Sequence, residues 1–182
     1  KFIISKELSN YKENILASLS VISNFYNFEK LKKNLFVGFC VPRGRGSLIN
    51  YTKGSKKLII LDESYNSNPL SLKFALERLD TFNIKKNKKF LLIGDMLELG
   101  KYSKKLHIDI AKHINNLKIS KTYVFGDYIK HTFNNLRPQI KGRILTNKVD
   151  ILNLINKDLP NNSLLMVKGS NSTGLNKIIQ KL

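Results

Sequence analysis

The sequence predicts an α/β fold in which helices cover both faces of a mostly parallel sheet. Three observations support this: short apolar runs alternate with segments of helical spacing, the runs suit strands buried on both faces, and polar turns separate the two. Such an alternation requires parallel strands joined by right-handed crossovers, a Rossmann-like three-layer sandwich. The expected strands lie at 47–51, 57–61, 88–94, 121–126, 144–146 and 164–167.

Residues 1–42 do not have the pattern of the start of such a domain. The expected elements there are a short strand at 1–4, a helix at 14–22 with an apolar stripe, and a shorter helix at 28–35. The linker Val41-Pro-Arg-Gly-Arg-Gly46 combines proline and glycine, as chain reversals do. We therefore expect two parts, residues 1–42 and an α/β domain over 43–182.

The domain begins with a hairpin that leads into the most informative stretch. The apolar run 58–61 is followed by a polar turn, and then by Pro69 and apolar residues at 72, 75, 76 and 79. Proline suits the first position of a helix, and Asn68 before it suits the N-cap. Ligands of open α/β sheets bind at the carboxyl ends of strands, where this turn lies. Asp, Ser and Asn also simply form turns, so both interpretations stand.

Later elements follow the same pattern. Gly94 and Gly100 bracket an acidic turn after the second buried strand, where backbone can approach a ligand closely or the acids can cap a helix. His107 lies beside the apolar face of the next expected helix, and a lone helical histidine is more often structural than catalytic. The expected helices of the domain lie at 69–79, 103–117, 127–135, 149–157 and 175–182.

Composition narrows the class of protein. The 182 residues suffice for a hydrophobic core, the apolar share of 42% is ordinary, and no apolar run approaches the length of a membrane span. A single cysteine, Cys40, excludes an internal disulfide framework and supplies no metal cluster. We expect a cytoplasmic protein without metal ligands of its own. Neither a dinucleotide-binding glycine motif nor a P-loop occurs.

The net charge of +19 leaves two interpretations open. Such an excess is typical of nucleic-acid-binding proteins. The excess is nearly all lysine, however, and no arginine-rich helix or ribonucleoprotein motif accompanies it. Lysine, asparagine and isoleucine are abundant together, which indicates compositional drift. A nucleic-acid surface would require the lysines to cluster on one face of the fold.

Four segments in order resemble motifs of the Mur ligase family. They are Gly44-Arg-Gly46, Asp62-Glu-Ser-Tyr-Asn-Ser-Asn-Pro69, Gly94-Asp-Met-Leu-Glu-Leu-Gly100 and Lys168-Gly-Ser170. They are most similar to those of the members that attach D-alanyl-D-alanine to a UDP-N-acetylmuramoyl-tripeptide. The resemblance covers nearly the whole chain. It implies the C-terminal domain of such a ligase, with residues 1–42 as the helical end of the central ATPase domain plus the linker.

The resemblance also implies roles for individual residues. The nucleotide-binding set is Arg45, Asp62, Glu63, Tyr65, Asn66 and Asn68, and the dipeptide-binding set is Asp95, Glu98, Lys168, Gly169 and Ser170. Arg45 is expected to reach the nucleotide phosphates when the domains close, unless the linker is only a basic hinge. Glu63 replaces an aspartate of the family, and Asn171 replaces an arginine. These departures put a ribose contact and an anion contact in doubt.

The family couples ATP cleavage to amide formation through an acyl phosphate. The resemblance implies ATP and Mg²⁺ as cofactors, held by a P-loop and metal ligands of the central domain that this sequence lacks, so we expect no activity of this chain alone. The expected partners are ATP, D-alanyl-D-alanine and UDP-N-acetylmuramoyl-tripeptide, without nucleic acid or membrane, and the expected state is a monomer. The alternatives are a basic α/β module that binds nucleic acid and a Mur-type ligase that adds another amino acid.

Overall fold

The computed structural model describes residues 2–4, 8, 11–39 and 41–182, in two compact units, Lys1–Val41 and Pro42–Leu182. The first unit contains helix α1 (Lys12–Ile22) and a 3-10 turn, η2 (Phe28–Lys30). The ring of Phe2 lies 6.4 Å from that of Phe28 and 5.8 Å from that of Phe36, so three aromatic side chains gather in this unit. The division falls one residue before the boundary expected from the sequence.

Two expectations for the first unit are wrong. The helix expected at 28–35 is a single 3-10 turn, because Leu31 adopts extended backbone and so short a helix is marginal in water without extensive packing. Residues 2–4 form no strand: among the described residues, their backbone makes one hydrogen bond to a distant segment, from the amide of Ile3 to the carbonyl of Lys33 at 2.8 Å. Lys1, Asn10 and Cys40 lie outside the described residues.

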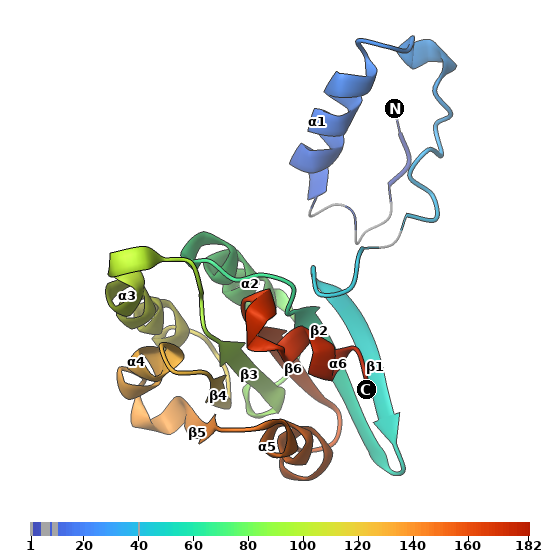
Figure 1. The fold of residues 1–182 in the computed structure, drawn as a ribbon. Coiled ribbons are helices and arrows are strands. Elements are labelled where there is room, and N and C mark those ends of the chain that lie inside the picture. The colour runs from blue at the N-terminus through green and yellow to red at the C-terminus, as the bar shows by residue number, and fades with distance from the viewer. Residues whose placement is uncertain (1, 5–7, 9–10, 40) are drawn as a thin grey trace. The chain divides into compact units, whose positions relative to one another are not determined.

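The second unit is built on a six-stranded sheet with the order β1-β2-β6-β3-β4-β5 (Figure 1). The strands are β1 (Ser47–Lys53), β2 (Lys56–Glu63), β3 (Lys89–Gly94), β4 (Lys121–Phe125), β5 (Lys141–Leu145) and β6 (Ser163–Lys168). Strand β1 pairs antiparallel with β2, and every other pair is parallel. All six expected strands are therefore present. The last strand in the sequence, β6, lies between β2 and β3.

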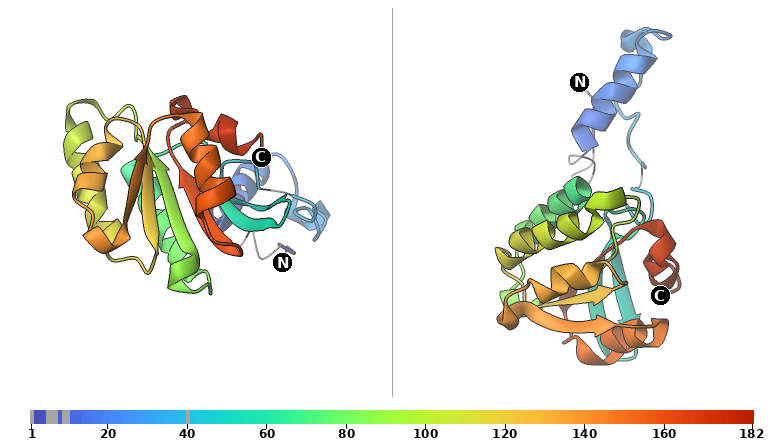
Figure 2. Two further views of the ribbon diagram at one scale, coloured as in Figure 1. Left: turned by 90° about the horizontal axis from the view of Figure 1, so that it is seen from below. Right: turned by 60° about the vertical axis from the view of Figure 1, so that its left-hand side comes forward.

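Helices cover both faces of this sheet (Figure 2). The helices are α2 (Pro69–Thr81), α3 (Ser103–Asn115), α4 (Ile129–Asn134), α5 (Lys148–Asn153) and α6 (Leu175–Ile179). On one face α2, α3 and α4 bury side chains such as Leu76, Ile114 and Ile129 against the sheet. On the other face α5, the π-helical turn Leu154–Asp158 and α6 do the same with Leu154 and Leu175. The predicted three-layer fold is confirmed.

The helix boundaries differ from the expected ones mainly where short turns continue a helix. The segment expected as one helix at 149–157 is α5 followed by the π-helical turn, and α6 ends at Ile179. Single 3-10 turns, η3 (Lys86–Lys88), η4 (Gly100–Tyr102), η5 (Pro138–Ile140) and η7 (Asn171–Thr173), precede or follow the larger elements. None of the helices among the described residues is both long and apolar enough to cross a bilayer.

The start of α2 fixes the loop that precedes it. The side chain of Asn68 accepts a hydrogen bond from the amide of Ser71 at 2.8 Å, and the hydroxyl of Ser71 accepts one from the amide of Asn68 at 3.0 Å. This reciprocal cap, with Pro69 at the first helical position, satisfies amides that a helix start otherwise leaves unpaired. The predicted N-cap is confirmed.

Candidate functional site

The sequence-predicted site residues lie at the carboxyl edge of the sheet, where the loops after β2, β6 and β3 adjoin. Because these three strands are neighbours and parallel, the loops at 63–68, 169–174 and 95–99 start side by side. Residues 42–46 run along the first of these loops before β1 begins. The site is therefore built from four segments that are far apart in the sequence.

Asp62 ties the linker to the β2–α2 loop. Its buried carboxylate accepts hydrogen bonds from the amide of Gly44 at 3.0 Å and from the amide and hydroxyl of Ser64. The backbone adds bonds from Gly46 to Asp62 at 2.7 Å and from Tyr65 to Gly44 at 3.0 Å. Gly44 has a φ of +78°, and a Cβ there would lie 2.9 Å from the Cβ of Tyr65, so this close approach requires glycine. The segment at 44–46 is bonded into the domain.

Arg45 and Tyr65 form the most ligand-like pair of the site. The guanidinium carbon of Arg45 lies 4.2 Å from the centre of the Tyr65 ring, within the range of a cation–π contact. Tyr65 remains 43% exposed, so one aromatic residue and one cation stand together at the edge of the sheet. A stacked ring and a phosphate are the groups that such a pair can recognise.

Glu63 lies between two cations. Arg78 on α2 donates to it at 3.1 Å, and the Nζ atom of Lys168 lies 3.9 Å from its other oxygen. Arg78 also donates to the carbonyl of Gly46 at 2.8 Å. The extra methylene that distinguishes Glu63 from aspartate thus carries its carboxylate into an internal ion-pair network. The sequence analysis did not identify Arg78 as a site residue. Its only signal in the sequence was its position on the helix that follows the loop at 63–68.

Lys168 is a buried cation at the end of the central strand β6. Its Nζ atom donates to the carbonyl of Asn66 at 2.9 Å and so holds the exposed part of the β2–α2 loop. Burial lowers the pKa of Lys168 below its ordinary value, and the charge of Glu63 acts in the opposite direction. Lys168 is therefore placed to position Asn66.

Ser170 joins three loops. Its hydroxyl accepts a hydrogen bond from the amide of Leu97 at 2.9 Å and lies 3.2 Å from the carbonyl of Ser67, to which it donates. Its own amide donates to the carbonyl of Asp95 at 3.0 Å. A Cβ on Gly169 would lie 3.0 Å from Leu175, so the turn is closely packed. The predicted dipeptide loops at 95–99 and 168–170 are therefore in direct contact.

The two acids of the β3 loop have very different surroundings. Asp95 is 8% exposed, and its carboxylate accepts from the amides of Asp127 at 3.0 Å and Ile129 at 2.7 Å, so it secures the loop after β4. Glu98 is exposed and has a φ of +62°, a left-handed backbone that costs a non-glycine residue energy. Such strain tends to be retained at functional sites. A substrate contact stays a prediction for both residues, and Glu98 is the better placed.

His107 has a structural role in this site. It is fully buried, its Nε2 atom accepts from the amide of Met96 at 3.1 Å, and its Nδ1 atom lies 2.8 Å from the carbonyl of Ser103. These contacts assign the proton to Nδ1. Burial, the largest cause, lowers the pKa of His107 below its ordinary value. The neutral ring therefore pins the β3 loop to α3.

The remaining polar groups complete the site. Asn66 and Asn68 are exposed beside Tyr65, whereas Ser67 between them is buried and its hydroxyl has no hydrogen-bond partner among the described residues. The side chain of Asn171 accepts a hydrogen bond from Asn176, so it faces α6. In the described part of the chain, no three His, Cys, Asp or Glu side chains gather as metal ligands.

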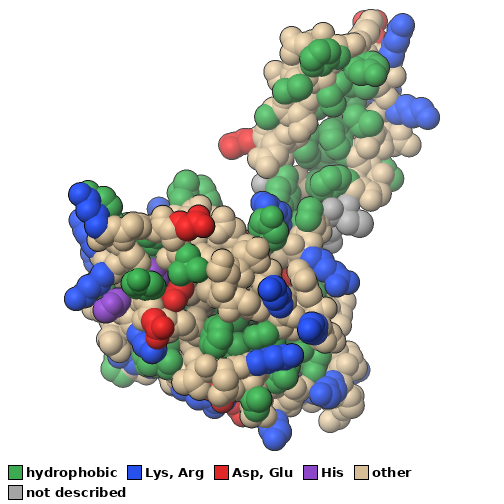
Figure 3. Space-filling view, in the orientation of Figure 1, with side chains coloured by type: hydrophobic (Ala, Val, Ile, Leu, Met, Phe, Trp, Pro, Cys, Tyr) green, Lys and Arg blue, Asp and Glu red, His purple; other side chains and the backbone are tan. Residues whose placement is uncertain are grey.

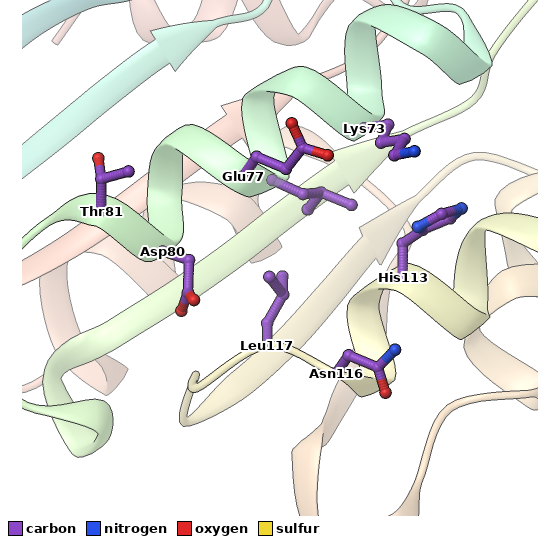
Figure 4. A pocket seen from close by; sticks show the side chains of 8 residues that line it. Lys73, Glu77, Asp80, Thr81, His113, Asn116 and Leu117 are labelled. Carbon is purple, nitrogen blue, oxygen red and sulfur yellow. The ribbon is translucent and has the colours of Figure 1, made fainter.

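A separate groove of about 400 Å³ lies between α2 and α3 (Figure 4). Its lining includes Lys73, Glu77, Asp80 and His113, and it includes none of the sequence-predicted site residues. The polar and charged side chains stand apart along the two helices in Figure 4 and do not converge on one point. We therefore place the candidate site at the carboxyl edge of the sheet.

Comparison with known proteins gives a consistent result. The family model described as "Mur ligase, glutamate ligase domain" matches residues 45–171. The UDP-N-acetylmuramoyl-tripeptide–D-alanyl-D-alanine ligase of Rickettsia prowazekii is 26% identical over 93% of this chain and 36% of its own length. The Bacillus subtilis ligase of the same name is 25% identical over 94% of this chain and 38% of its own. The chain thus spans about a third of the length of these relatives.

Solved structures show the same fold. The MurF ligase of Thermotoga maritima, in complex with ADP, is similar with a TM-score of 0.68 and 22% identity, over 92% of this chain and 36% of that one. MurF of Acinetobacter baumannii gives a TM-score of 0.69 and 22% identity, over 91% of this chain and 35% of that one.

Proposed function

Because this chain belongs to the Mur ligase family, we propose that it is the C-terminal domain of a UDP-N-acetylmuramoyl-tripeptide–D-alanyl-D-alanine ligase of peptidoglycan synthesis. In that proposal residues 1–42 end the central ATPase domain, and the reaction takes place in the cytoplasm. The chain alone is inactive, because the P-loop belongs to the part of the ligase outside this sequence. The observation that supports the proposal most is the joining of all four motifs at one edge of the sheet.

The nucleotide side of the proposed site is the surface around Arg45 and Tyr65. The exposed ring offers a stacking surface, Arg45 above it offers a cation for phosphate, and Asn66 is exposed beside them for polar contacts. Asp62 and Glu63 support this surface from below through the linker, Arg78 and Lys168. We therefore propose direct nucleotide contacts for Arg45, Tyr65 and Asn66, and positioning roles for Asp62, Glu63 and Asn68.

The dipeptide side is the pair of loops that Ser170 joins. Glu98 offers an exposed carboxylate for the ammonium group of D-alanyl-D-alanine. Gly169 and Ser170 bring their backbone close to the same place, and Lys168 and Asp95 hold the two loops. Holding the amine in a fixed position next to the acyl group would lower the activation free energy of amide formation and so supply a large part of the rate acceleration of such a ligase.

ATP and Mg²⁺ are proposed cofactors of the complete ligase. The surface of Arg45 and Tyr65 fits a nucleotide, whereas Asp62 and Glu63 already bind amides and cations of this domain and do not form a metal site. When bound, ATP would supply the phosphoryl group that activates the substrate carboxylate. This domain's own residues would orient the nucleotide and the amine and close over them, which excludes water.

Calorimetric titration of the chain with ADP and with D-alanyl-D-alanine tests the two sides separately. Tyr65→Ala is expected to abolish ADP binding, whereas Tyr102→Ala, a second exposed ring beside a cation (Lys101 at 5.2 Å), should leave it unchanged. Glu98→Gln should weaken dipeptide binding about tenfold, with Glu77→Gln on α2 as the matched control. Binding of D-glutamate in preference to the dipeptide would favour another Mur-type ligase. Binding of neither ligand would contradict the proposal for this domain alone.

A further inference from the structure

At one edge of its sheet the second unit carries many basic residues and almost no acidic ones. We call the residues that precede the parallel strands, with the β1–β2 turn, the amino edge: 53–57, 82–89, 116–121, 135–141 and 156–163. These segments contain twelve Lys or Arg residues and one acid, Asp158, which is paired with Arg143. The opposite edge carries Asp62, Glu63, Asp95, Glu98 and Asp127 beside Arg43, Arg45, Lys101, Lys130 and Lys168, so its charges are mixed. Compositional drift alone would not leave one edge almost without acids.

Some of these lysines are explained by the hydrogen bonds that they donate to carbonyl groups at the C-terminal ends of helices. Lys89 donates to the carbonyl of Asp80 at the end of α2, at 3.0 Å, and Lys141 to that of Asn134 at the end of α4, at 3.1 Å. Cations are favoured there by the helix dipole. The exposed lysines Lys53, Lys57, Lys85, Lys86, Lys118 and Lys157 are not explained in this way. Among the described residues, no lysine of the amino edge forms an ion pair with a carboxylate.

We propose that the amino edge docks this domain onto an anionic lipid surface. The segments follow one another along the ends of adjacent parallel strands, so their charges form a broad, shallow rim. Lysine interacts as a point charge and suits diffuse attraction to a charged plane, where each lysine contributes independently. Figure 3 shows the general excess of Lys and Arg over Asp and Glu on the face in view.

The same edge is poorly suited to a nucleic-acid duplex. Duplex binding uses helix N-termini and backbone amides as well as cations, and the amino edge presents helix C-terminal ends, such as those of α2 and α4. The large exposed apolar side chains of the second unit, in its described residues, lie outside the amino edge: Leu48, Tyr65, Leu70, Phe74, Tyr102, Tyr128 and Val149. Without an apolar anchor, binding to lipid is expected to be reversible and sensitive to salt.

Docking by this edge has a consequence for the candidate site. The amino and carboxyl edges lie at opposite ends of the same strands, so lipid at one edge leaves the loops around Tyr65 and Ser170 directed away from the bilayer. The inference does not depend on the proposed ligand chemistry, because the two edges share no binding residue.

Co-sedimentation with vesicles tests the inference. The chain is mixed with neutral phosphatidylcholine vesicles and with vesicles that also contain phosphatidylglycerol, at about 50 mM and about 300 mM salt. Binding is expected only to the anionic vesicles and is expected to fall at the higher salt. The variant Lys53→Glu, Lys57→Glu, Lys86→Glu should weaken that binding about a hundredfold. The matched control Lys73→Glu, Lys104→Glu, Lys105→Glu alters three exposed lysines on α2 and α3 by the same charge and should lose far less.

Several outcomes would overturn the inference. If both triple variants lost the same amount of vesicle binding, the net charge of the chain rather than the amino edge would determine that binding. If the chain bound neutral and anionic vesicles equally well, exposed apolar side chains would cause the binding. Tighter binding to a DNA duplex, lost in the edge variant, would assign the edge to nucleic acid. Titration of both variants with ADP keeps the two proposals apart, because the edge variant should bind the nucleotide as the unmodified chain does.

Discussion

Arg78 donates a hydrogen bond to the carbonyl oxygen of Gly46 at 2.8 Å while its other nitrogen binds Glu63 at 3.1 Å. One half-buried guanidinium thereby holds the start of the domain against the end of β2. We expect Arg78→Ala to lower the free energy of unfolding by about 2 kcal/mol, because it leaves a carbonyl and a carboxylate without their donor. Arg78→Lys should recover only part of the lost free energy of unfolding, since lysine has one ammonium nitrogen in place of the two guanidinium nitrogens that bind Glu63 and Gly46. Urea denaturation measures both.

Arg137→Ala is the control for this prediction, because Arg137 is exposed. It should change the free energy of unfolding by less than about 0.5 kcal/mol. An Arg78→Ala variant as stable as the unmodified chain would show that water replaces Arg78 as the hydrogen-bond donor to Gly46 and Glu63.

Asp95→Asn is expected to destabilise the domain. The carboxylate accepts from two amides through separate oxygens, and an asparagine would turn an NH₂ group toward one of those donors. We expect a loss of about 2 kcal/mol in thermal or urea unfolding. Asp109→Asn, at an exposed pair with Lys112, should have almost no effect. If Asp95→Asn removed dipeptide binding at full stability, Asp95 would be a substrate ligand rather than a structural anchor.

The buried histidine makes stability depend on pH. Because burial lowers the pKa of His107 in the folded state, the unfolded chain takes up a proton more readily as the pH falls below about 6.5. The contribution of His107 to the free energy of unfolding is therefore complete above about pH 6.5. As the pH falls from there toward the lowered pKa of the folded state, the free energy of unfolding decreases by at most about 1.4 kcal/mol per pH unit.

Thermal unfolding between about pH 5 and about pH 7.5 measures this dependence. His107→Gln should be less stable than the unmodified chain near neutral pH but should have a shallower dependence below about pH 6.5. His113→Gln, at an exposed histidine of α3, serves as the control and should keep the original dependence. An unchanged slope in His107→Gln would show that other groups cause the loss.

Ser67→Ala should stabilise the domain. The hydroxyl of Ser67 is buried without a hydrogen-bond partner among the described residues, whereas its backbone carbonyl accepts from Ser170. An unpaired buried hydroxyl costs about 1 kcal/mol or more, which alanine would recover without disturbing the backbone bond. Urea denaturation should show the gain, and Ser71→Ala, which breaks the cap of α2, should show a loss of about 1 kcal/mol. A loss of stability in Ser67→Ala would mean that the hydroxyl is paired in solution.

The sequence was sufficient to predict the fold where local and long-range signals agree. Continuous apolar runs identified the buried strands, and Asn68 with Pro69 identified the start of α2. The first unit was predicted less well, because a strand at 1–4 and a helix at 28–35 both need packing partners that periodicity does not reveal. The π-helical turn after α5 also leaves no signature in apolar spacing.

The sequence predicted where the candidate site lies but not which hydrogen bonds and ion pairs connect its side chains. Motif order indicated which loops matter, and the parallel sheet brought them together. Which acids remain accessible depends on side-chain partners distant in sequence, as Asp95 with Ile129 and Glu63 with Arg78 show. Such partners cannot be deduced from residue type and spacing alone.

The position of β6 has a consequence for how the chain is made. Strands β2 and β3 both pair with β6, which follows them by some seventy or more residues of sequence. During synthesis these two strands emerge long before their shared neighbour, so each presents an unpaired edge until Ser163–Lys168 leaves the ribosome. Closing such a long loop makes the last step slow. The domain is therefore expected to complete its sheet only after β6 has been synthesised and to depend until then on protection from aggregation.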